Sequence, residues 1–293
     1  MNWFYIALIS AVLSAASAIS QKKVLFSLSA LEFSFLVSLF NILFSIPFFF
    51  AFDIGAVSPT SIGILFGKSI MGALAFYNVM HALKNLDISG ALPLLVLTPG
   101  FVALFAFLFG LEQLTIIQIS GMFLLLAGTY LLEMKPKQAV AEPFKIFSKS
   151  SNYHYIGFAL ILFTASSILD KVLLGKYKMP PTAFMAFQQL FYAIVIGAVY
   201  LFSSKIKRNP LTTFDKKIWF WVIIISILTM GYRFTQIKAI KIAPVSLVLS
   251  VKRISVFIAV VIGGRLFNEK NLLKKALATA IMVAGAIMIM EEG

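Results

Sequence analysis

The chain contains no cysteine and only two histidines, His81 and His154, among its 293 residues. The absence of cysteine excludes disulfides, thiolate metal ligands and cysteine nucleophiles, and two histidines are too few for a histidine-built metal centre. Charged residues are also scarce, at 12% of the chain, whereas soluble domains carry about a quarter. We therefore expect no metal and no cofactor, and a surface so poor in charge indicates a protein whose solvent is the lipid bilayer.

Hydrophobic residues are abundant, at 60% of the chain, and the mean hydropathy is +0.97. About 20 apolar residues cross the hydrocarbon core of a bilayer as an α-helix. Ten such runs are present, at roughly 2–20, 31–52, 60–82, 88–110, 114–133, 154–174, 181–202, 217–237, 243–264 and 272–290. No basic segment precedes the first run, so we interpret it as a span rather than a cleaved signal peptide. The sequence predicts an all-α, multi-pass integral membrane protein, which we expect in the cell (plasma) membrane.

A polar linker at residues 134–153 separates five runs from five, which gives a first repeat over 1–133 and a second over 154–293. With the halves offset by 157 residues, similar residues fall at the same points of their runs: Glu112/Glu269, Gly128/Gly285, Lys84/Lys241 and Ser89/Ser246. Because five is odd, the second copy enters the membrane in the opposite sense. The pattern predicts two inverted five-helix repeats around a central cavity near the midplane; the alternative is ten unrelated helices.

Short motifs at matching points of the two halves carry a family resemblance. Residues 97–102 (LTPGFV), followed by Gly-Leu-Glu at 110–112, resemble the fourth-span signature of the EamA-type drug/metabolite transporter superfamily, and residues 263–269 resemble its second-half counterpart. The ten runs in two repeats extend this resemblance over essentially the whole chain. It implies substrate transport without ATP hydrolysis, through a central cavity between the repeats.

Polar residues recur every three or four positions along several runs, and each set therefore shares one helical face. The sets are Ser10, Ser14, Ser17 and Gln21; Ser34, Ser38, Asn41 and Ser45; Thr229, Arg233 and Gln236; and Ser246, Ser250 and Arg253. Serine stripes also permit close helix packing, so in the first two runs both interpretations stay open. The residues expected to line a cavity are Ser14, Ser17, Ser38, Asn41, Gln188, Gln189 and Tyr232, although the glutamines could join helices and the tyrosine could face lipid.

Four cations lie within the runs: Lys68, Arg233, Lys252 and Arg253. A lysine or arginine at the centre of a span costs about 2.5–3.5 kcal/mol, and no acidic residue lies deep in any run, since Asp170 is near an end. Water, backbone carbonyls or an anionic ligand must then compensate them, although Lys68 and Arg233 could also reach an interface. We expect an anionic group to be bound by Lys252, Arg253, Arg233, Gln236, Lys68 and Ser250.

The segment Ser250–Arg253 (SVKR) also resembles the Lys-Arg pair on the ninth span of plastid triose-phosphate translocators, which implies recognition of an anionic group such as phosphate. Arginine suits bidentate contact with oxyanions, and lysine acts as a point charge. No catalytic set is visible, and the segment 63–69 is one residue short of a P-loop. We therefore expect no enzyme activity.

The resulting hypothesis is a secondary transporter of a small organic metabolite with an anionic group, working by alternating access. An efflux permease for amino acids or amphiphilic compounds stays open, as does a membrane-embedded enzyme or lipid-handling protein. The net charge of +14 lies mainly in short loops, so we expect the bilayer rather than nucleic acid as partner, and a monomer or homodimer. Lysines and arginines gather in loops after odd-numbered runs, which places both termini outside, whereas the family resemblance implies termini inside.

Overall fold

The computed structural model describes residues 2–86, 88, 92, 95, 97–110, 115–133, 151–203, 216–266 and 272–290. In these ranges the chain is helical, without strands. The α-helices are α1 (Trp3–Leu25), α2 (Ala30–Phe49), α3 (Pro59–Asn85), α5 (Leu97–Leu108), α6 (Ile116–Glu133), α8 (Ser151–Lys171), α9 (Pro181–Leu201), α11 (Lys216–Ile242), α12 (Val245–Lys252), α13 (Ile254–Leu266) and α14 (Leu272–Met290). A 3₁₀ turn at Ile54–Ala56 precedes α3, and a π-helical turn at Val172–Lys176 extends α8.

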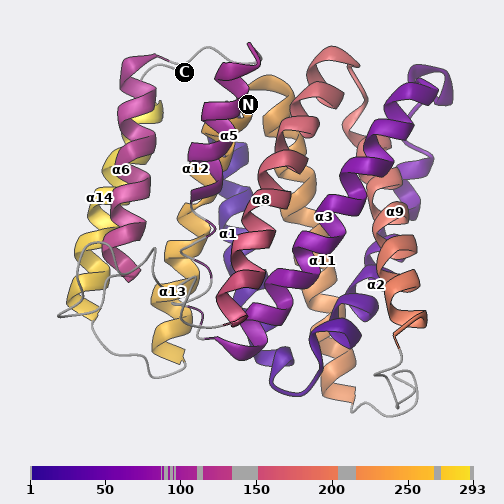
Figure 1. Cartoon of the computed structure of the whole chain (residues 1–293), viewed down its shortest axis with the longest axis horizontal. Coiled ribbons are helices and arrows are strands. Elements are labelled where there is room, and N and C mark those ends of the chain that lie inside the picture. Colours follow the sequence, from indigo (N-terminus) through magenta and orange to yellow (C-terminus); the bar gives the residue numbers. More distant parts are fainter. Residues whose placement is uncertain are drawn as a thin grey trace.

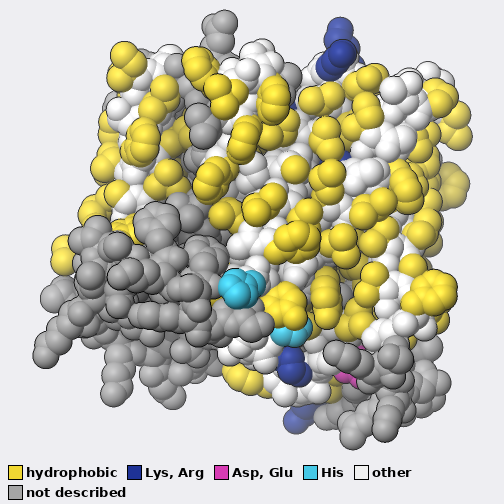
Figure 2. Space-filling model, viewed as in Figure 1, with side chains coloured by type: hydrophobic (Ala, Val, Ile, Leu, Met, Phe, Trp, Pro, Cys, Tyr) yellow, Lys and Arg dark blue, Asp and Glu magenta, His cyan; other side chains and the backbone are white. Residues whose placement is uncertain are grey.

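Among the described residues, seven helical segments are long and apolar enough to cross a membrane. They are Trp3–Leu25, Ala30–Phe49, Pro59–Asn85, Asn152–Lys176, Pro181–Leu201, Lys216–Ile242 and Val245–Leu266. Apolar side chains are spread widely over the described part of the face seen in Figure 2, which suits contact with lipid. The chain is therefore a multi-pass integral membrane protein. Helices also occupy the other three predicted runs, at 88–110, 114–133 and 272–290, but the count of ten crossings remains a prediction.

Local sequence signals explain where several helices begin and end. Ser29 and Glu32 form a capping box at the start of α2, in which the serine hydroxyl accepts from the Glu32 N–H and the carboxylate accepts from the Ser29 N–H. Ser58 caps α3, whose first residue is Pro59. The ninth predicted run is divided into α12 and α13 by a turn at Arg253. This break places a charged residue where the helix is interrupted.

Helices from the two halves of the chain pack against each other throughout the bundle. The main pairs are α1 with α11, α3 with α8, α2 with α9, and α6 with α14 (Figure 1). If each helix is exchanged for its predicted equivalent in the other half, the α1–α11 pair becomes the α8–α3 pair. The α2–α9 and α6–α14 pairs are unchanged by the exchange. The packing is therefore compatible with a two-fold relation between the halves.

The α6–α14 contact depends on two glycines, Gly128 and Gly285, which the sequence offset matches to each other. A Cβ on Gly128 would lie 2.9 Å from the Ala278 carbonyl oxygen, and one on Gly285 would lie 2.7 Å from the Gly121 carbonyl oxygen. The backbones approach too closely for any side chain at either position. The repeat-matched glycines thus meet at one interface.

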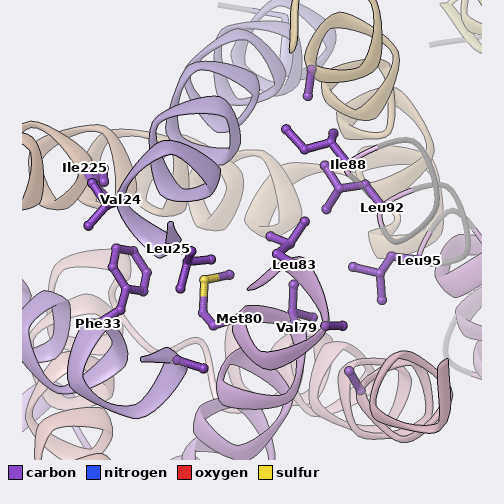
Figure 3. Close-up of a cluster of buried hydrophobic side chains, with 14 of the residues drawn as sticks. Val24, Leu25, Phe33, Val79, Met80, Leu83, Ile88, Leu92, Leu95 and Ile225 are labelled. Atoms are coloured by element: carbon purple, nitrogen blue, oxygen red, sulfur yellow. The ribbon is translucent and has the colours of Figure 1, made fainter. Parts of the chain in front are cut away.

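Two apolar clusters occupy opposite ends of the bundle. One cluster gathers residues from the end of α1, the start of α2 and the end of α3, including Leu25, Phe33 and Leu83 (Figure 3). The other includes Phe4 at the start of α1 and Leu173 in the turn after α8, at the upper side of Figure 1, where α1 begins and α14 ends. Polar residues are concentrated between the two clusters, and this placement positions the site.

Candidate functional site

A cavity of about 130 Å³ lies inside the bundle, and we call it the central cavity. Residues of both halves line it, from α2, α3, α5, α8, α9, α11 and α12, with Arg253 at the α12–α13 turn. The polar ones are Ser38, Asn41, Thr98, Ser166, Ser167, Asp170, Gln189, Tyr192, Thr229, Tyr232, Arg233, Gln236, Lys252 and Arg253. The cavity wall therefore combines apolar side chains with many polar groups and three cationic side chains.

Neutral side-chain oxygens hold two of these cations in place. Arg233 donates from Nη2 to Gln188 Oε1 at 2.8 Å and from Nη1 to Gln236 Oε1 at 3.2 Å. Lys252 Nζ donates to the same Gln236 oxygen at 2.5 Å and lies 4.5 Å from the centre of the Tyr232 ring. Amide oxygens and an aromatic face orient a cation but leave its charge in place. Arg233 and Lys252 are thus held at the cavity by neutral groups.

Arg253 completes the cationic group at the turn between α12 and α13. Its Nε is buried and has no hydrogen-bond partner among the described residues. Ser250, one helical turn earlier, is 1% exposed, lies outside the lining of the central cavity and has a buried hydroxyl with no partner in the same ranges. Arg253 therefore faces the cavity, whereas Ser250 lies behind its wall.

Lys68 has a different environment. Its Nζ lies 2.6 Å from Asp170 Oδ1, both side chains are almost fully buried, and the ammonium lies 4.6 Å from the centre of the Phe184 ring. The expectation that the intramembrane cations lack a protein counter-ion is therefore wrong for Lys68. The sequence predicts Asp170 near the end of a span, but in the structure the helical segment continues to Lys176 through the π-helical turn. Asp170 lines the central cavity, and Lys68 lies behind it.

The residues predicted to line a cavity do not all line the same one. Ser38, Asn41, Gln189 and Tyr232 line the central cavity, and Gln188 holds Arg233. Ser14 lines a second, adjacent cavity of about 120 Å³. Ser17 lines neither one: its hydroxyl lies 3.3 Å from Thr229 Oγ1 and accepts from Gln21 Nε2 at 2.9 Å.

Several lining residues were missed from the sequence. Asp170 of α8 follows the adjacent Ser166 and Ser167 by four and three residues, and this spacing could have identified one polar face. Tyr192 of α9 follows Gln188 and Gln189 by four and three residues, but its contact could not be foreseen, because its hydroxyl is accommodated by Gly72 on α3, where any Cβ would collide with it. That fit between α9 and α3 arises only in the folded bundle.

The charged groups that line the cavity are suited to binding. Among the described lining residues there are three cations and one carboxylate, that of Asp170, which is paired with Lys68. The described part of the chain holds no cluster of three or more histidine, aspartate or glutamate residues that could bind a metal. The repeat-matched Glu112 and Glu269, and most of the linker, lie outside the described residues. The arrangement suits an oxyanion, which arginine and lysine can contact together.

Comparison with known proteins identifies a family and a fold. The family model described as EamA-like transporter family matches residues 1–134 and 153–291, which is nearly the whole chain. A solved structure titled only "Crystal structure of protein" resembles the chain with a TM-score of 0.72 and 17% sequence identity, over 99% of this chain and 96% of that one. At that identity the likeness shows the fold alone. No curated protein matches the chain.

Proposed function

Because this chain belongs to the EamA-like transporter family, we propose that it is a secondary transporter of a small organic metabolite that carries an anionic group. The family accounts for a membrane transporter of small molecules. The observation that carries the finer proposal is that Arg233, Lys252 and Arg253 line one cavity, and that the first two donate hydrogen bonds to neutral amide oxygens. An anionic substrate group would supply charge compensation for these three cations.

The charges in the cavity support an anion over a neutral or cationic substrate. Each of these cations would cost about 2.5–3.5 kcal/mol at the centre of a span, and arranging three around one cavity adds mutual repulsion. A carboxylate or phosphate that binds between the three cations would offset this cost and this repulsion. The hydroxyl and amide groups of Ser38, Asn41 and Gln189 would then contact the rest of the substrate.

Alternating access between the halves 1–133 and 154–293 is the proposed mechanism. Two lysine contacts support an inverted relation between the halves. Lys22 of α1 donates to the Leu86 carbonyl just after α3, and Lys171 of α8 donates to the Ala243 carbonyl just after α11. Leu86 and Ala243 are separated by the same 157-residue offset as the sequence repeat, and α3 and α11 end on opposite sides of the bundle (Figure 1).

Flux into proteoliposomes tests this function. Purified protein would be reconstituted and assayed with labelled phosphate, dicarboxylates, phosphorylated metabolites, amino acids and cations. We expect uptake or exchange of an anionic compound, which Lys252→Ala with Arg253→Ala abolishes. Transport of the true substrate unchanged in that double variant would refute the site, and transport restricted to neutral or cationic compounds would refute the substrate class.

A second candidate, an amino-acid permease, is favoured by one observation. Asp170 lines the same cavity as the cations, so a substrate with both a carboxylate and an ammonium group could place its ammonium near Asp170. The same flux panel separates the candidates. Competition by neutral amino acids, with none by phosphate or simple carboxylates, would favour the second.

A further inference from the structure

The second cavity, of about 120 Å³, borders the central cavity directly. The two share four lining residues: Phe76, Phe163, Tyr232 and Arg253. Their volumes are nearly equal, at about 130 and 120 Å³. We call this second space the inner chamber. Its remaining lining comes mainly from the later parts of α1 and α3 and the start of α13, toward the lower side of Figure 1.

Polar groups continue from the central cavity into the inner chamber. Thr229 lines the central cavity and contacts Ser17, which accepts a hydrogen bond from Gln21, a residue of the inner chamber. Ser14 and Ser255 also line the chamber. A chain of side-chain hydrogen bonds therefore joins the two spaces, although the rest of the chamber wall is largely apolar.

Arg253 is the one cation among the described lining residues of the inner chamber, and it also lines the central cavity. It stands at the turn between α12 and α13, and its buried Nε has no hydrogen-bond partner in the described ranges. Lys252 and Arg233 line the central cavity only. Arg253 can thus contact an anion from either side, whereas the other two cations hold it in one place.

We propose that the inner chamber is a second anion-binding station on the transport path, and that Arg253 passes the anionic group between it and the central cavity. This inference rests on the proposed transport of an anion. A charged group bound by three cations leaves slowly unless another favourable site adjoins it, and a shared arginine supplies that site. Lys22, near the end of α1, donates to the carbonyl of Leu83, near the end of α3, and Leu83 lines the chamber. This contact joins the two helices beside the chamber.

The lack of native cysteine makes the chamber directly testable. Single cysteines would be placed at Ser255 for the chamber, at Ser38 for the central cavity, and at the fully buried Ser69, which lines neither, as the matched control. Each full-length variant is treated with anionic and cationic methanethiosulfonates of similar size. Rates are measured with and without inorganic phosphate or succinate.

We expect Ser255→Cys to react about tenfold faster with the anionic reagent, because a cation in a low-dielectric cleft concentrates anions. Phosphate or succinate should slow that reaction, Arg253→Gln in the same background should remove the preference, and Ser69→Cys should not react. Equal rates for both reagents would overturn the inference, as would an unreactive Ser255→Cys beside a reactive Ser38→Cys. Protection at Ser38→Cys but not at Ser255→Cys overturns the chamber alone; protection at neither position overturns the proposed function as well.

Discussion

Lys68 and Lys252 are both lysines within membrane-spanning segments, yet their surroundings differ in kind. Lys68 is fully buried beside the carboxylate of Asp170. Lys252 lies at the cavity with an amide oxygen and an aromatic ring beside it, and two arginines line the same cavity. A buried charge that is paired with an opposite charge, as in Lys68, serves as a structural contact. A charge that is oriented by neutral groups, as in Lys252, stays available to a ligand. The two lysines should therefore respond differently to mutation.

The largest effect is expected from breaking the buried pair. Asp170→Leu would leave Lys68 charged and uncompensated, which costs about 3–5 kcal/mol of folding stability for pairs of this kind. Unfolding in detergent measures the loss. The double variant Lys68→Met with Asp170→Leu should recover most of it, because no charge is left unpaired. A single variant as stable as the unmodified protein would show that the pair has no structural role.

Next in size is the loss of transport when the cavity cations are removed. Lys252→Met with Arg253→Gln should reduce flux of the anionic substrate by at least about 100-fold, equivalent to about 2.8 kcal/mol. The melting temperature should stay the same or rise, since uncompensated charge has left the membrane interior. Reduced stability together with normal flux would mean that Lys252 has a structural role and does not bind substrate.

Part of this contrast was predictable from the sequence. The apolar runs predicted the helices, and the three-and-four spacing placed Arg233 and Gln236 on one polar face and Arg253 on another. These three residues line the central cavity, as does Lys252, which the sequence marked only as a cation within a span. The pairing of Lys68 was not predictable, because its partner is distant in sequence and a π-helical turn extends the helix beyond Asp170. Helical period assigns a residue to a face, but it does not say which helix that face meets.

A smaller effect is expected at Gln236, whose side-chain oxygen accepts from both Arg233 and Lys252. Gln236→Leu should raise the half-saturating substrate concentration about tenfold, or about 1.4 kcal/mol, because both cations lose their orientation. Thr235→Val is the matched control, since in the described part of the chain that hydroxyl donates to the Gly231 and Tyr232 carbonyls of its own helix. Equal effects of the two substitutions would mean that the orientation of the cations is unimportant.

The smallest effect is expected at Tyr232, whose ring lies beside Lys252. Tyr232→Phe keeps the ring and should change transport by no more than about twofold, whereas Tyr232→Leu should weaken binding about fivefold, equivalent to about 1 kcal/mol of cation–π contact. Concentration-dependent flux separates the two variants. A defect in Tyr232→Phe as large as that in Tyr232→Leu would assign the role to the hydroxyl rather than the ring.

Ligand-induced stabilisation tests the central claim most directly, because it reports binding without requiring transport. The purified protein and the Lys252→Met, Arg253→Gln variant would be melted in the presence of increasing phosphate, dicarboxylates, phosphorylated metabolites and neutral amino acids. We predict saturable stabilisation by an anionic compound in the unmodified protein and none in the variant, since a ligand that binds only the folded state raises its stability. Equal stabilisation of both proteins, or stabilisation by uncharged compounds alone, would contradict the claim that Lys252 and Arg253 bind the anionic group of the substrate.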